Sequence, residues 1–229
     1  MKVVVLAGGT STERDVSLST GKMIYKALKN NGHKVILLDV YLGYEGDTAN
    51  LFDIEKDWAE GIGGIGTDNP DINQIRALRK GNPDHFFGPN VLDICGMADI
   101  VFLALHGENG EDGRIQAAFD LMGIKYTGTD YASSAIAMNK AISKELFAYN
   151  DIPTPKGIFA KKGEKFTWNH YPCVVKVNNG GSSVGVSIVH KPEELDAGIE
   201  NALQYGDEFV IEEYIKGREF SMGVIDGKA

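Results

Sequence analysis

The sequence predicts an α/β protein of two domains, in which a parallel-sheet domain precedes an α+β domain. Two apolar runs at residues 2–7 and 34–40 flank an amphipathic stretch at 16–30, which is the pattern of a βαβ unit in a parallel sheet. After Pro153 and Pro155, short strand-like runs dominate instead. The length of 229 residues also exceeds that of one small domain.

The first domain is predicted to span residues 1–138. Its apolar run at 2–7 is typical of a buried parallel strand, and 34–40 is predicted to be the second strand. Residues 41–90 are rich in Gly, Asn, Asp and Pro, so we expect an irregular surface insertion with a short helix near 72–79. After this insertion, a strand is expected at 99–105 and a helix at 113–122. One or two further helices are expected at 132–150.

The second domain is predicted to span residues 139–217 and to be α+β, with antiparallel strands. A helix is expected at 192–204, because Pro192 and the acidic residues after it are typical of a helix start. Residues 218–229 are assigned to the start of a further domain. The predicted strands lie at 157–161, 173–178, 185–189, 209–213 and 218–225.

The last residues, EFSMGVIDGKA, carry a hairpin signal at Asp226-Gly227. No returning strand follows in this sequence. A hairpin without its second arm leaves unpaired backbone groups, so we expect that the natural protein continues and that this chain is a fragment.

The composition favours a soluble cytosolic protein that binds small molecules. A net charge of −9 argues against nucleic acid or an anionic membrane as the main partner. Cys95 and Cys173 are far apart and belong to no Cys/His cluster, so neither a disulfide framework nor a zinc site is indicated. The first apolar run is too short for a signal peptide, and no apolar stretch approaches the roughly 18 residues of a membrane span.

A Gly- and Ser-rich loop lies between two strand-like runs in VVKVNNGGSSVGVSIV, residues 174–189. Glycines allow backbone N–H groups to converge on an anion, and Lys176 on the preceding strand adds a positive charge. Hairpin turn chemistry alone explains the same composition, so both interpretations stand at this point. A Walker-type P-loop is excluded, because no Lys-Ser/Thr pair and no helix follow the glycines.

Two further segments follow predicted parallel strands, at the sheet edge where ligands of α/β folds usually bind. GGTSTERDVSLS, residues 8–19, lacks the GxGxxG fingerprint and contains Glu13, which could hold an ammonium group or be a solvated acid of the first helical turn. HGENGEDG, residues 106–113, places His106 after a strand as a binding or catalytic candidate. Glu111, with its acidic and basic neighbours, is interpreted as a capping or solvated charge.

Several charged residues elsewhere are ambiguous by themselves. Lys140, like Lys176, reads as a solvated surface lysine unless a ligand lies nearby. The acids of the segment 212–219 alternate near a presumed nucleotide site, where they either point outward or accept hydrogen bonds from ribose hydroxyls.

Taken together, these segments resemble the D-alanine:D-alanine ligase family of ATP-grasp enzymes. The resemblance covers nearly the whole chain, and residues 41–90 are its loosest part. The matching pieces are GGTSTERDVSLSTG, LALHGENGEDG, MNK at residues 138–140, VVKVNNGGSSVG and VIEEYIKGREF at residues 210–220.

The resemblance implies a Rossmann-like pre-ATP-grasp domain followed by the central ATP-grasp domain, with the rest of the ATP-grasp fold missing. It implies a bacterial cytoplasmic enzyme that joins two D-alanines with ATP, through an acyl phosphate, for peptidoglycan synthesis. Mg²⁺, with Mn²⁺ as an alternative, is the implied metal. A homodimer through the first domain is also implied.

The resemblance also implies roles for individual residues. Glu13 would bind the ammonium of the first D-alanine, supported by Ser182, and His106 would lie beside that substrate. ATP would be bound by two lysines, the loop and the strand that follows: Lys140, Lys176, Gly180, Gly181, Ser182, Ser183, Gly185, Glu212, Glu213, Tyr214 and Ile215, with Glu219 on the ribose.

The sequence departs from the family pattern in two ways. Val177 stands where the family commonly has Pro after the phosphate-binding Lys. The family's metal ligands and oxyanion-binding Arg are expected beyond residue 229, so we predict that this chain alone lacks ligase activity.

Two other functions remain as alternatives to D-alanine:D-alanine ligation. One is a D-alanine:D-lactate or other ATP-grasp ligase, and the other is a non-catalytic nucleotide-binding module. A nicotinamide-dependent oxidoreductase is disfavoured by the missing GxGxxG.

Overall fold

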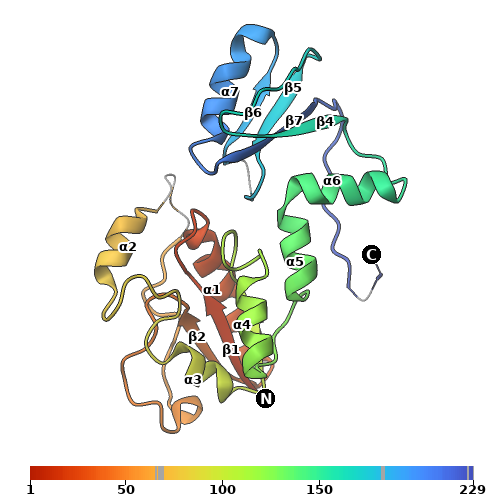
Figure 1. The fold of residues 1–229 in the computed structure, drawn as a ribbon. Helices are drawn as coiled ribbons and strands as arrows, with labels where there is room; N and C mark the ends of the chain where they lie inside the picture. Colours follow the sequence, from red (N-terminus) through yellow and green to blue (C-terminus); the bar gives the residue numbers. More distant parts are fainter. Residues whose placement is uncertain (65, 67–69, 182–183, 226, 229) are drawn as a thin grey trace. The chain divides into compact units, whose positions relative to one another are not determined.

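The computed structural model describes residues 1–64, 66, 70–181, 184–225 and 227–228. The chain divides into two compact units, Met1–Asn139 and Lys140–Ala229. The first contains a parallel sheet and the second an antiparallel one (Figure 1). The predicted fold class is therefore confirmed, while the assignment of 218–229 to a further domain stays a prediction.

The sheet of the first unit has the order β2-β1-β3 among the described residues, and all its pairs are parallel. The central strand β1 is buried from Val3 to Ala7, because its side chains alternate between hydrophobic cores on the two faces of the sheet. All three carboxyl ends meet at one edge, where ligand sites of open α/β sheets form. The strands are β1 (Lys2–Ala7), β2 (Lys34–Asp39) and β3 (Ile100–Leu103).

Helix α1 (Arg14–Asn30) connects β1 to β2 and begins two residues earlier than predicted. It lies close to the sheet at Gly21, where an added Cβ would stand 2.7 Å from Ala7 Cβ and 2.9 Å from Leu37 Cδ1. Only glycine permits this approach, because side chains in a packed interior have no room to retreat. Tyr25, one turn later, is buried in the same core.

The insertion at 41–90 is more than a surface loop, which corrects the prediction. It contains the 3-10 turn η1 (Leu51–Asp53) and helix α2 (Ile72–Leu78). Leu51 is buried in the core on the face of the sheet opposite to the one that Tyr25 covers. Arg79 holds the insertion by donating hydrogen bonds to three backbone carbonyls, those of Tyr41, His85 and Phe87.

Three helices complete the first unit, of which α3 (Val91–Gly96) is not predicted by the sequence. Together with α4 (Arg114–Met122) it contributes to the core that contains Leu51. Asp130 caps α5 (Tyr131–Met138) by accepting a hydrogen bond from Ser133 N at 2.8 Å. The chain leaves the helical conformation at Asn139, so residues 132–150 form two helices, α5 and α6.

The second unit begins with α6 (Lys140–Tyr149) and contains a sheet of order β4-β7-β5-β6 among its described residues, all pairs antiparallel. The 3-10 turn η2 (Pro192–Glu194) and helix α7 (Leu195–Ala202) form the predicted helical segment, and α7 packs on the sheet through Ile199 and Ala202. The strands are β4 (Gly157–Lys161), β5 (Cys173–Val177), β6 (Val186–Val189) and β7 (Glu208–Glu213).

The prediction of a strand at residues 218–225 is wrong. Its apolar side chains alternate as in a strand, but Phe220, Met222 and Val224 are all exposed and pair with no described strand. A period-2 pattern forms a strand only when a neighbouring strand takes up its backbone hydrogen bonds. The hairpin signal persists locally, because Ile225 and Lys228 pair across Gly227, whose φ is +73°.

Candidate functional site

The turn after β1 is held by a buried ion pair. Arg14 donates a hydrogen bond from Nη1 to Gly9 O at 2.6 Å and pairs through Nη2 with Asp39, at the end of β2. The second carboxylate oxygen of Asp39 accepts hydrogen bonds from the backbone N–H groups of Tyr41 and Leu42. One ion pair therefore joins the turn that carries Glu13 to the carboxyl end of the neighbouring strand.

A buried serine ties the same turn to β3. Ser17 Oγ donates a hydrogen bond to Ala104 O at 2.7 Å and accepts one from Gly8 N at 2.9 Å. Ser17 is fully buried, so both bonds replace water that the interior excludes. The ends of all three strands are thus fixed relative to one another.

Glu13, His106 and Glu111 gather at this edge. Ser11 Oγ donates to His106 O at 2.8 Å, and Thr20 Oγ1 lies 3.1 Å from His106 Nε2. Glu111 accepts a hydrogen bond from Gly107 N at 2.7 Å, and a Cβ on Gly107 would lie 2.7 Å from Glu13 Oε2.

The surroundings of Glu13 disfavour its charged form. Burial and the nearby Glu111 carboxylate raise the pKa of Glu13, and His106 opposes them. A cation placed between the two carboxylates would relieve their repulsion. Sequence reasoning interpreted Glu111 as a capping or solvated charge; the structure instead has it accept a hydrogen bond within the loop from Gly107 N, and the interpretation missed its effect on Glu13.

We expect the substitution Glu13→Gln to stabilise the chain at neutral pH. Because the pKa of Glu13 is raised in the folded state, stability falls as the pH rises from its ordinary value of 4.5 through the raised value. At pH 7 the uncharged amide should raise the Tm by about 1–2 °C, and at pH 4 the gain should vanish. Thermal melts at both pH values measure this. Glu60→Gln is the exposed control, and an equal gain at both pH values would contradict the prediction.

In the second unit, Lys140 is held by the end of β5 and the loop that follows. Its Nζ donates to Gly180 O at 2.6 Å, and its backbone N–H donates to Asn178 O at 3.2 Å. The buried Asn178 side chain accepts from Ala141 N at 2.9 Å, so the start of α6 is fixed to the loop. Burial and the nearby Lys176 lower the pKa of Lys140.

Glu212 on β7 holds two lysines, one on each carboxylate oxygen. Lys176 from β5 pairs with Oε1, and Lys144 from α6 lies 2.7 Å from Oε2. Burial by itself would raise the pKa of Glu212, but hydrogen bonds from Lys144 and Lys176 bring it below its usual value. The structure therefore pairs two lysines with one buried carboxylate, and Lys140 is near enough to interact electrostatically with both Lys176 and Glu212.

The remaining residues predicted to bind ATP lie in the loop after β5 or at and beyond the end of β7. Gly180 and Gly181 lie in the loop after β5, and Gly185 has a φ of +66°. Ser182 and Ser183 lie outside the described residues. Glu213 accepts a hydrogen bond from Lys156 N, whereas Tyr214, Ile215 and Glu219 are exposed and form no described contact with the lysines.

Sequence reasoning missed Lys144 and Asn178. Lys144 follows Lys140 by four residues on one helix, so the two side chains share a face, and this spacing was the available signal. Asn178 is part of the Gly-rich loop, but its role depends on contacts with distant residues.

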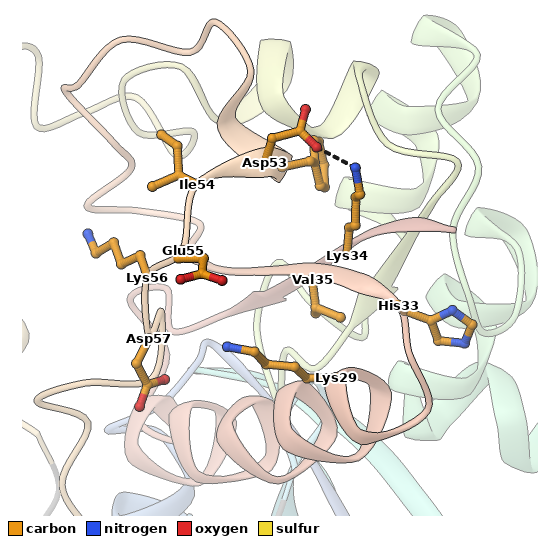
Figure 2. A pocket seen from close by; sticks show the side chains of 10 residues that line it. Lys29, His33, Lys34, Val35, Asp53, Ile54, Glu55, Lys56 and Asp57 are labelled. Carbon is orange, nitrogen blue, oxygen red and sulfur yellow. Dashed lines mark hydrogen bonds and ion pairs between the residues drawn. The ribbon is translucent and has the colours of Figure 1, made fainter.

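A separate hollow of about 470 Å³ lies at the amino end of β2, away from the edge that carries Glu13 (Figure 2). Its charges balance, and Lys34 is paired with Asp53 across it. This hollow lacks the excess of one charge that a charged ligand would need. Its charged lining residues, apart from His33, are Lys29, Lys34, Lys56, Asp53, Glu55 and Asp57.

The described part of the chain contains no group of three or more His, Cys, Asp or Glu that could hold a metal ion. Nor does any described helix combine the length and the apolar character that crossing a bilayer requires.

Comparisons with known proteins bear on these sites. Residues 2–129 match the family model for the D-ala D-ala ligase N-terminus, and residues 151–229 match the model for its C-terminus. The chain is 45% identical over 241 residues to a D-alanine--D-alanine ligase of Lacticaseibacillus casei (strain BL23), with all of this chain and 65% of that protein covered. The chain thus spans about two thirds of the length of this curated relative.

Solved structures agree. A D-alanine--D-alanine ligase from Bacillus anthracis complexed with ATP is 28% identical, with a TM-score of 0.66, over 95% of this chain and 60% of that one. The VanG D-Ala:D-Ser ligase from Enterococcus faecalis is 27% identical, with a TM-score of 0.64, over 94% and 63%. With both family models matched, this chain belongs to the D-alanine--D-alanine ligase family.

Proposed function

We propose that this chain provides the substrate-binding and nucleotide-binding parts of an enzyme that joins two D-alanines with ATP. Family membership supports the reaction. The observation that carries the proposal is the cluster of Lys140, Lys144 and Lys176 near the single carboxylate of Glu212, which leaves an excess of positive charge. Such an excess suits a polyphosphate.

The first D-alanine would be bound in the first unit. Its ammonium group would lie between Glu13 and Glu111, where a cation relieves the repulsion that raises the pKa of Glu13. His106, oriented by Thr20, would lie beside this substrate. Ser182, outside the described residues, keeps its predicted supporting role as part of the proposal.

ATP would be bound in the second unit, where the residues fit its phosphates. Lys140 and Lys176 supply charge, and the glycines of 180–185 let backbone N–H groups approach closely. The adenine would lie against Glu212 and the residues after it, with Glu219 on the ribose. The adenine-lining residues are Glu212, Glu213, Tyr214 and Ile215.

The reaction would proceed through an acyl phosphate, formed when the carboxylate of the first D-alanine attacks the γ-phosphate of ATP and ADP leaves. The amine of the second D-alanine would then attack the acyl carbon, form the peptide bond and release phosphate. Lysine charges and loop N–H groups would neutralise the charge that develops on the transferred phosphoryl group. Closure of the loop would keep water from the acyl phosphate. Because the described residues contain no set of metal ligands, we assign Mg²⁺ to none of them.

Binding is the direct test, because the roles proposed for this chain are the binding of D-alanine and of ATP. Titration calorimetry should detect ATP binding and, with a nucleotide present, D-alanine binding that Glu13→Gln weakens. Absence of ATP binding would overturn the proposal.

In turnover assays, phosphate release that requires both ATP and D-alanine would identify ligation. The VanG relative is named a D-Ala:D-Ser ligase, so the second substrate of the ligation needs its own test. Faster turnover with D-lactate or D-serine than with a second D-alanine would favour the alternative ligase.

A cytoplasmic location and a homodimer formed through the first unit are further parts of the proposal. Family membership supports the location. Sedimentation of the chain as a monomer at micromolar concentration would contradict the dimer.

A further inference from the structure

Lys144 has a different environment from the two lysines predicted to contact ATP. Its Nζ has three hydrogen-bond acceptors: Glu212 Oε2 at 2.7 Å, Thr154 Oγ1 at 3.1 Å and Pro155 O at 2.5 Å. An ammonium group has three N–H donors, so these contacts use all of them. Lys144 is therefore fixed in place, with no donor left for a ligand.

Lys176 is held more loosely on the other oxygen of the same carboxylate. Among the described residues, its Nζ donates only to Glu212. Its side chain is 30% exposed, against 17% for Lys144. With respect to the described residues, Lys176 therefore has further donors as well as access to solvent, and it can turn toward a phosphate while Lys144 cannot.

A turn of Lys176 toward a phosphate would leave Glu212 with one cation. Glu212 is 92% buried, being 8% exposed, and a buried carboxylate without a partner is strongly disfavoured. Lys144 keeps that carboxylate paired in either position of Lys176. Without Lys144, Glu212 would retain Lys176 and compete with the phosphate for it.

We propose that Lys144 is a positioning residue that holds Glu212, so that Lys176 is free to pass from this carboxylate to a nucleotide phosphate. The proposal rests on the proposed function, because it requires that the second unit bind a nucleotide. Lys144 itself would not touch the nucleotide.

The test is a double-mutant cycle on ADP affinity in the 229-residue chain. Lys144→Met should weaken ADP binding about tenfold in the presence of Glu212 but less than about twofold in the Glu212→Gln background. Lys161→Met is the matched control, because it removes an exposed lysine that is paired with Glu208 on the same sheet, and it should leave affinity unchanged. Thr154→Val, which removes one contact of Lys144 and keeps the charge, should weaken binding two- to threefold.

The pH dependence distinguishes positioning from a general loss of structure. With Lys144→Met, burial should raise the pKa of Glu212, so protonation at lower pH should release Lys176 and lessen the loss of ADP affinity. Equal losses in both Glu212 backgrounds, or a loss that does not change between pH 8 and pH 5.5, would overturn the role of Lys144. Absence of ADP binding by the unsubstituted chain would instead overturn the proposed function and this role with it.

Discussion

Replacing Arg14 with Met is expected to lower the free energy of unfolding of the first unit by about 3 kcal/mol. Arg14 is 4% exposed, and its guanidinium group is bound to Gly9 O and Asp39. Methionine fills much of the volume but leaves a buried carbonyl and a buried carboxylate without their cation. The turn that carries Glu13 would lose its connection to β2, so D-alanine affinity should fall as well.

Urea unfolding followed by Trp58 fluorescence measures this loss, because Trp58 lies in the first unit and the only other tryptophan, Trp168, is replaceable by Phe. Lys34→Met is the matched control: it breaks an exposed ion pair with Asp53 at the opposite end of the same strand. We expect little change from the control. Equal effects of the two substitutions would show that burial of the Arg14 pair is unimportant.

Replacing Lys176 with Ala should weaken ATP binding by about 2 kcal/mol, or roughly thirtyfold. The substitution removes a cation that would contact phosphate, while Lys144 keeps Glu212 paired and the fold intact. A direct phosphate contact therefore predicts a large loss of affinity with a small change in stability of the free chain.

Calorimetric titration with ATP and a melt without ligand separate these two effects. Lys161→Ala serves as the control on strand β4 of the same sheet, because Lys161 is exposed and its ion pair with Glu208 lies away from Glu212 and Lys144. Unchanged ATP affinity in Lys176→Ala would remove the main support for the phosphate site. A large loss of stability would assign Lys176 a structural role instead.

The sequence predicts well those elements whose stability is local or whose pattern is unambiguous. The apolar run of β1 and the amphipathic α1 are both found, because a buried parallel strand and a two-faced helix have distinct periods. Helix α3 is missed because it has six residues and is preceded by Asn90, whose φ is +57° and whose side chain forms no cap. The segment 218–225 is mispredicted because a strand depends on a partner elsewhere in the chain.

The candidate site was predictable to the extent that a local motif carries it. Glu13, His106 and Lys176 follow or lie on predicted strands and so could be named in advance. For Lys144 the only signal was its spacing of four residues from Lys140, which is weak because a lysine on a helix is usually solvated and its partner Glu212 is 68 residues away. The effect of Glu111 on Glu13 likewise arises only when the ends of β1 and β3 are adjacent.

The pairing of Lys176 with Glu212 bears on which anions the second unit can select. An anion that binds Lys176 competes with a carboxylate that is already in place, so a weakly held monovalent ion such as chloride has little advantage over the internal partner. A polyphosphate carries several charges and can engage Lys140 at the same time. Competition from the Glu212 carboxylate therefore favours the binding of multivalent anions over that of the abundant monovalent salts of the cell.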